Sequence, residues 1–154
     1  MAQKGKRPIA FWVICVFFIY SMLFLLAGQT TALFNYDFAV RLGLQEPVEE
    51  ISRYGIEVNR SFGGSDTIIY LPMIVVSLVG LSRGKRWSLL TTSAVMGISA
   101  YWAVVVVFML LFLRGVPSFN LAAGPGYWII MAIYIIFGVW GILYLVFRGD
   151  KLVT

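Results

Sequence analysis

The chain has 154 residues, of which 60% are hydrophobic and 12% are charged, whereas about 25% of an average soluble domain is charged. Four charge-free stretches carry this excess, at residues 8–36, 67–82, 87–113 and 115–147, and a membrane-spanning helix needs about 20 apolar residues. The composition therefore excludes a water-soluble enzyme, a disordered linker and a singly anchored protein, and predicts one all-α integral membrane domain over residues 1–154.

The net charge of +5 comes from 12 Lys and Arg against 7 Asp and Glu. In a soluble protein this balance would suggest nucleic acid, but most of these cations flank the apolar stretches, as in the cytoplasmic loops of membrane proteins. We therefore expect no nucleic-acid partner. The chain has no His and one Cys, so zinc, haem and iron–sulfur sites lack ligands, and we expect neither a metal nor another cofactor.

The first expected span covers residues 8–29 and follows Lys4, Lys6 and Arg7. Its apolar stretch from Ile9 to Gly28 has 20 residues, which is longer than the usual apolar region of about 7 to 15 residues in a secretory signal. The sequence therefore predicts a retained first helix rather than a cleaved signal.

Residues 30–65 form the expected long outer segment, in which acidic residues outnumber basic ones. Pro47 followed by apolar residues at three-residue spacing, and then Gly55, predicts a short amphipathic helix with a proline near its start and a glycine at its end. Residues 34–42 suggest a further turn or two of helix. We expect this segment to lie over the outer mouth of the helices.

The second expected span, residues 66–82, is short. Its charge-free part has 16 residues, which at 1.5 Å per residue covers only about 24 Å of a hydrocarbon core about 30 Å thick. Either the membrane thins there or the helix begins before Asp66 and carries its carboxylate to the membrane border. Pro72 also predicts a kink, because a proline inside a helix removes one backbone hydrogen bond.

The last two expected spans are residues 87–113 and 127–147, with aromatic residues at their ends. Eight Lys and Arg flank the side of the termini and four lie on the other side. The positive-inside rule therefore predicts cytoplasmic N- and C-termini in a plasma (inner) membrane protein. The expected fold is an antiparallel four-helix transmembrane bundle with a long outer loop between the first two spans.

No Asp, Glu, Lys, Arg or His lies in the interior of these expected spans, since Asp66 is at the border of the second. This argues against a proton- or sodium-coupled transporter acting alone. The polar groups at mid-depth are neutral, and Tyr101 would need a hydrogen-bonding partner there. Ser93, Gly97 and Ala100 form a small face on the third span, which is typical of helix packing.

The densest polar cluster occupies residues 59–67. Arg60 and Asp66 could pair there, or Ser65 or Asp66 could simply cap the second span. The candidate ligand-binding residues are Asn59, Arg60, Ser61, Asp66, Tyr70, Tyr101 and Trp102. Arg60 and Asp66 would hold a polar group, Asn59 and Ser61 would orient it, and the three aromatic side chains would line the apolar part.

The leading functional hypothesis is the binding or transport of a small or lipid-like molecule through an outward-facing cavity. An accessory subunit of a larger membrane complex, in contact through the small face of the third span, is the alternative. A cofactor-free membrane enzyme with Asp66 as acid or base is a second alternative, for which no further catalytic residue is assigned. The expected partners are membrane lipid, a small lipophilic ligand, and a second copy of the chain or a larger complex.

Overall fold

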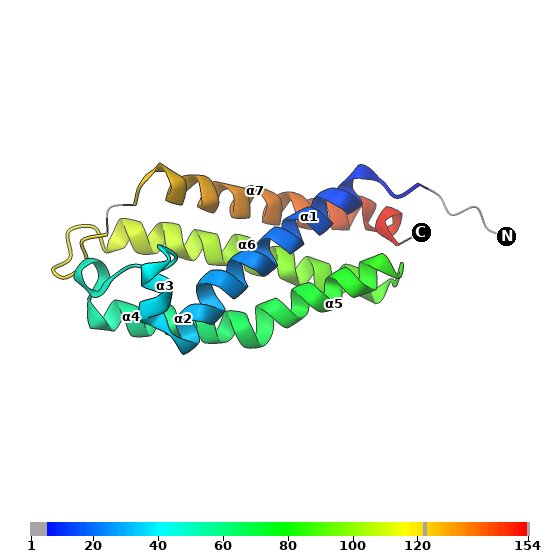
Figure 1. Cartoon of the computed structure of the whole chain (residues 1–154). Helices are drawn as coiled ribbons and strands as arrows, with labels where there is room; N and C mark the ends of the chain where they lie inside the picture. The colour runs from blue at the N-terminus through cyan, green and yellow to red at the C-terminus, as the bar shows by residue number, and fades with distance from the viewer. Residues whose placement is uncertain (1–5, 122, 154) are drawn as a thin grey trace.

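The computed structural model describes residues 6–121 and 123–153, so Lys4 lies outside the described residues. Every regular element in these ranges is a helix. Four helical stretches are long and apolar enough to cross a membrane, at Ile9–Phe34, Val48–Ser82, Trp87–Phe112 and Pro125–Leu152. They lie side by side, and α1 crosses in front of α6 and α7 in the view of Figure 1. The prediction of an all-helical membrane protein with four spans is thus confirmed at this level.

The first stretch consists of α1 (Ile9–Phe24), the π-helical turn η1 (Leu25–Thr30) and α2 (Thr31–Phe34). It starts after Pro8, whose backbone is extended, and it reaches five residues beyond the predicted end at residue 29. Asn35 then leaves the helical conformation, and its side chain accepts a hydrogen bond from the backbone N–H of Phe38 to cap α3 (Tyr36–Arg41). The predicted short helix near residues 34–42 is therefore present.

The second stretch differs most from the sequence prediction. Helix α4 (Val48–Ser65) begins after Pro47, as predicted, and is interrupted at Ser52, whose backbone is not helical, but it does not end at Gly55. It continues through the π-helical turn η2 (Asp66–Tyr70) into α5 (Leu71–Ser82). The second span therefore begins well before residue 66, and the segment predicted to lie as a separate cap over the bundle is largely a helical extension of that span.

A close helix contact explains why this helix does not stop before Asp66, and the nearby hydroxyls bond to the helix backbone instead of capping a new helix. The hydroxyls of Ser61, Ser65 and Thr67 each donate to the backbone carbonyl four residues earlier. Gly63 lies so close to the first stretch that an added Cβ would be 2.7 Å from the carbonyl oxygen of Gln29. Asp66 has helical dihedral angles inside the continuous helix, so the prediction that Ser65 or Asp66 caps a helix here is wrong.

The two π-helical turns pack against each other where the first two stretches cross. The hydroxyls of Thr30 in η1 and Thr67 in η2 are 3.0 Å apart. Pro72 lies in the first turn of α5, directly after η2. A wider π turn is a recognised site of helix bending, and Figure 1 shows α4 and α5 running in different directions, in agreement with the predicted kink.

Helices α6 (Trp87–Phe112) and α7 (Pro125–Arg148) form the most extensive helix pair. Gly138 allows this contact, because an added Cβ would lie 2.7 Å from the carbonyl oxygen of Met96 and 2.8 Å from the Cβ of Ala100. Ala100, one residue of the predicted small face on α6, thus packs against α7 of the same chain. Gly97 has open space at its Cβ position.

Basic residues gather at the end of the molecule where the described termini lie (Figure 1). There Arg7 donates to the carbonyl oxygen of Leu81 at 2.9 Å. Arg86 pairs with Asp150, which lies in the short 3₁₀ helix η3 (Gly149–Leu152), at 3.1 Å. The α3–α4 segment and the loop between α6 and α7 occupy the opposite end, and that end carries the candidate site.

Candidate functional site

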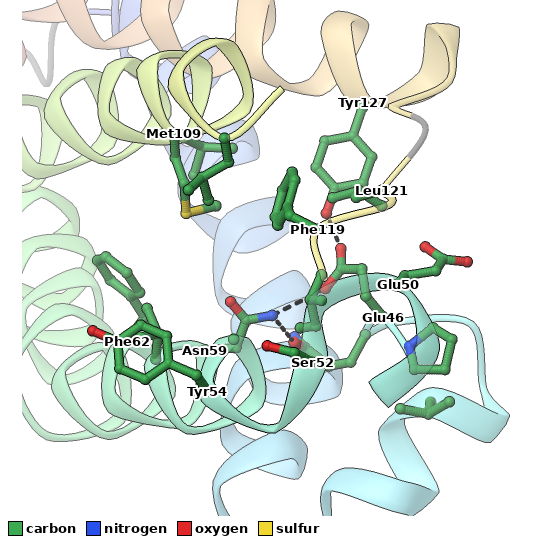
Figure 2. A pocket seen from close by; sticks show the side chains of 18 of the residues that line it. Glu46, Glu50, Ser52, Tyr54, Asn59, Phe62, Met109, Phe119, Leu121 and Tyr127 are labelled. Atoms are coloured by element: carbon green, nitrogen blue, oxygen red, sulfur yellow. Dashed lines mark hydrogen bonds between the residues drawn. The ribbon is translucent and has the colours of Figure 1, made fainter. Parts of the chain in front are cut away.

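A cavity of about 920 Å³ opens between α4, α6, α7 and the loop after α6. Figure 2 shows this space, with Tyr54, Asn59 and Phe62 of α4 on one side and Met109 and Tyr127 on the other. Its floor, which we define as Phe24, Trp102 and Met131, comes from the first, third and fourth stretches. The volume lies within the range of small-molecule sites, about 300 to 1,000 Å³.

Two of the seven predicted ligand-binding residues, Asn59 and Trp102, line this cavity. Tyr70 lies outside it, and its hydroxyl is 2.6 Å from the Oγ of Ser99 inside the bundle. Tyr101 is 72% exposed on the outer surface of α6. The seven residues therefore do not form a single site.

Arg60, Ser61 and Asp66 also lie away from the cavity lining. Arg60 donates to Glu57 Oε2 at 3.0 Å and to the carbonyl oxygen of Leu33 at 3.4 Å. Asp66 follows Arg60 by six positions along the helix, which turns the two side chains about 240° apart, so the predicted pair does not form. Asp66 is only 7% exposed, which makes it a buried carboxyl of the second span rather than an outer ligand.

The polar end of the cavity is organised around Glu46. Its Oε1 accepts a hydrogen bond from the hydroxyl of Tyr127, and its Oε2 accepts one from Asn59 Nδ2 at 3.0 Å, as Figure 2 shows. The same amide group donates to Gln45 Oε1 at 3.1 Å and to the hydroxyl of Tyr36 at 3.3 Å. These contacts fix a carboxyl group beside Asn59 and connect α7 to α4.

The environment of Glu46 alters its acidity. Burial raises the pKa of the Glu46 carboxyl above its usual value of 4.5, while hydrogen bonds from its own backbone and from Asn59 act against the increase and the charge of Glu50 adds to it. Burial likewise raises the pKa of Tyr36 to about 12. Tyr36 therefore stays protonated at neutral pH and can donate, as it does to the carbonyl oxygen of Glu46 at 3.0 Å.

The cavity wall is aromatic and its charged groups are acidic. Six aromatic side chains line it: Phe24, Tyr54, Phe62, Trp102, Phe119 and Tyr127. Glu46 and Glu50 are the charged lining residues in the described part of the chain, and no Lys or Arg accompanies them. Aromatic faces attract cations, so both the wall and the carboxyl groups favour a positively charged or hydrogen-donating ligand with an apolar body.

The loop after α6 forms one wall of the cavity, at the end of the molecule opposite the described termini. The backbone N–H of Asn120 donates to the carbonyl oxygen of Glu50 at 2.6 Å, and the Asn120 side chain donates to that of Glu49 at 3.4 Å. Ser52 and Ser118, at φ values of 61° and 69°, are the non-glycine residues with positive φ in the described ranges. Both line the cavity, and strained backbone of this kind is concentrated at ligand sites.

Sequence reasoning missed Glu46, Glu50 and Tyr127. Glu46 and Tyr127 are 81 residues apart, and Glu46 lay in a segment interpreted as an exposed acidic loop. In the sequence, the aromatic residues at the start of the fourth span indicate only one end of that span. A search for carboxyl groups next to prolines on the outer side would have singled out Glu46, but nothing in the sequence pairs it with Tyr127.

In residues 6–121 and 123–153, no group of three or more His, Cys, Asp and Glu side chains could hold a metal ion. The absence of a cofactor stays a prediction. Comparison of the chain with protein-family models, with curated proteins and with solved structures finds no match.

Proposed function

We propose that this chain is an antiparallel four-span bundle of the plasma (inner) membrane that binds, and transports or presents, a lipophilic organic cation in its outward-facing cavity. The single observation that carries the proposal is the aromatic cavity with a fixed carboxyl group at its polar end. Apolar pockets with a few converging polar groups are the usual form of small-molecule sites. The absence of Lys and Arg among the described lining residues disfavours fatty acids, phosphates and other anions.

The orientation of the bundle rests on its basic residues. Eight Lys and Arg flank the side of the termini and four the other side, which favours cytoplasmic termini and a cavity open to the outside. A reporter that is active only in the cytoplasm should work when fused at residue 1 or after residue 154. Activity of a reporter that works only outside the membrane, fused after residue 154, would contradict this orientation.

The depth of the cavity suits an amphipathic ligand. Trp102 in the cavity floor lies 15 residues after Trp87, or about 22 Å along the helix from the inner border of a core about 30 Å thick. The floor therefore lies in the outer third of the hydrocarbon region, while Glu46 precedes the second stretch. A bound molecule would place its apolar rings near Trp102 and Phe24 and its positive charge toward Glu46.

Tetraphenylphosphonium and tetraphenylborate test this proposal, because the two ions share size and shape and differ in the sign of their charge. Binding of each radiolabelled ion is measured to the full-length protein in lipid nanodiscs, with protein-free nanodiscs as the blank. We expect saturable, one-to-one binding of the phosphonium and none of the borate. Equal binding of both ions would show that the cavity does not select for positive charge.

Matched variants locate the site. A phosphonium centre about 8 Å from the carboxylate gains about 2 kcal/mol at an effective dielectric constant of 20, so Glu46→Gln should weaken binding roughly thirtyfold. Glu49→Gln is the control, because Glu49 is exposed and outside the lining set. Equal losses in the two variants would mean that the cation binds to the acidic surface and not in the cavity.

An accessory-subunit role is the second candidate, and the open space at Gly97 favours it. A partner helix could approach α6 closely there, as α7 does at Gly138 on another face. Gly97→Leu would then release a co-purifying membrane protein without changing phosphonium binding.

A further inference from the structure

A second polar cluster lies within the bundle, next to the cavity floor. Its members come from all four spans: Ser21 of α1, Asp66 and Tyr70 of η2, Ser99 of α6 and Tyr134 of α7. Tyr70 and Ser99 share a hydrogen bond of 2.6 Å. Asp66 lies four residues before Tyr70, so the two side chains lie one turn apart on the same face of this helix. Ser21 lies one turn after Phe17, whose ring contacts the ring of Tyr134 at a centroid distance of 5.4 Å. These five side chains form the buried cluster.

Two hydroxyls of the buried cluster lack a hydrogen-bonding partner. Ser21 Oγ and Tyr134 Oη are both buried, and neither forms a hydrogen bond with the protein. A buried unsatisfied hydroxyl is costly, so these two hydroxyls are placed to bind a buried water molecule.

Asp66 is the ionisable centre of this cluster. By helical rise it lies about 24 Å from the inner end of α5, and therefore inside a hydrocarbon core about 30 Å thick. In the described ranges the ion pairs involve Glu57 and Asp150, and none involves Asp66. An intramembrane carboxyl without a cationic partner is expensive when ionised, and such groups serve substrate, ion or proton pathways in membrane proteins.

The groups around Asp66 are almost all neutral. The titratable side chains of the elements packed around it are Tyr70, one turn further along its own helix, Tyr134 of α7 and Tyr20 of α1. The adjoining η1 and α5 contain no ionisable residue, and α6 contributes Ser99. On α4 the nearest charges, Glu57 and Arg60, are paired with each other.

We infer that Asp66 and the four hydroxyls of the buried cluster form a proton-binding site whose proton is released when a cation occupies the cavity. This inference rests on the proposed function and adds a proton to its mechanism. In the step, the O–H bond of the Asp66 carboxylic acid breaks, its electron pair stays on the carboxylate, and the proton passes to water on the outer side. The bound cation replaces the lost positive charge, so the site exchanges one cation for one proton.

The cavity floor provides the link between the two sites. The rings of Trp102 and Phe24, which form two sides of the floor, contact the ring of Tyr134 at centroid distances of 5.5 and 6.3 Å. A cation above these rings lies within the same low-dielectric region as Asp66, where opposite charges attract strongly. Its presence therefore favours the ionised carboxylate, and by reciprocity the ionised carboxylate favours cation binding.

Calorimetric titration of tetraphenylphosphonium into the full-length protein in nanodiscs tests the inference. In two buffers of different ionisation enthalpy, the difference in binding heat gives the number of protons released by the unaltered protein. We expect proton release, and we expect Asp66→Asn, a mimic of the protonated acid, to lose the part that Asp66 supplies and to keep only what Glu46 releases. Equal proton release by Asp66→Asn and the unaltered protein would overturn the inference. Asp66→Asn should bind tetraphenylphosphonium roughly tenfold more weakly than the unaltered protein at alkaline pH and equally well at acidic pH. A tenfold change lies within the usual range of coupling between two sites.

Asp37→Asn is the matched control, because Asp37 is exposed on α3 and outside both sites, and it should release protons normally. Titration of Glu46 affects Asp66→Asn and the unaltered protein alike, so the ratio of their affinities isolates Asp66. Phosphonium binding without proton release in the unaltered protein would overturn the proton site and leave the proposed function standing. Absence of phosphonium binding at every pH would overturn both.

Discussion

The contact between α6 and α7 at Gly138 gives the sharpest stability prediction. A Cβ added there would lie 2.7 Å from the carbonyl oxygen of Met96 and 2.9 Å from the backbone nitrogen of Ala100. Both atoms belong to helical backbone and cannot move by rotating a side chain. Gly138→Ala must therefore push α6 and α7 apart by about 0.7 Å to restore a contact of 3.4 Å. A gap of about that size between the helices loses a quarter to a half of the dispersion energy of each neighbouring contact.

The magnitude follows from comparison with Gly97→Ala. Each substitution gains about 1 kcal/mol of helix propensity, and Gly97 has open space at its Cβ position. Overpacking of a close contact costs typically 1 to 3 kcal/mol, so Gly138→Ala should be less stable than Gly97→Ala by that amount. Gly141→Ala should fall between the two, because its Cβ would meet the flexible side chain of Met96.

Reversible unfolding of the full-length protein in mixed micelles, followed by circular dichroism as the denaturing detergent increases, measures these differences. The comparison uses the free energy of unfolding of each variant at one common detergent fraction. Equal stability of Gly138→Ala and Gly97→Ala would refute the close contact and, with it, the packing of α7 on α6 described above.

Three further predictions concern the cavity and the buried cluster. Ser52→Gly should raise the free energy of unfolding by about 1 to 3 kcal/mol, because φ of 61° and ψ of 171° is a region that essentially only glycine occupies without strain; an unchanged value would contradict that conformation. Ser99→Ala should lower the free energy of unfolding by about 1 to 3 kcal/mol, because it leaves the Tyr70 hydroxyl buried and unpaired. Tyr70→Phe should lower it by only about 0.6 kcal/mol, since Ser99 still donates to a backbone carbonyl. The opposite order would be inconsistent with the observed bonds. Because burial raises the pKa of Glu46, the folded state holds this proton more tightly than the unfolded state. The stability that Glu46 contributes therefore falls as pH rises from 4.5 through the folded pKa. Thermal unfolding measured across this pH range should show a smaller loss of stability in Glu46→Gln than in the unaltered protein.

The sequence by itself determined that this is a helical membrane protein with four spans. That information is local, because the length and apolarity of a stretch decide whether it can cross a bilayer. The start after Pro8, the start after Pro47 and the bend near Pro72 were likewise predictable, since a proline restricts its own backbone and removes one donor. The first span nevertheless extends to Phe34, beyond the predicted end.

Only the tertiary structure decided how far the second helix extends and where the site lies. Gly55 resembles a helix end in the sequence, yet the helix continues because Gly63 packs on the carbonyl of Gln29 and Thr67 meets Thr30. That continuity turns Arg60 and Asp66 to different faces and buries the carboxyl inside the bundle. Likewise, Glu46 acquires its hydrogen-bonded environment only when Tyr127, 81 residues away, donates to it. Contacts between distant segments decide both outcomes, and hydrophobic periodicity contains no information about them.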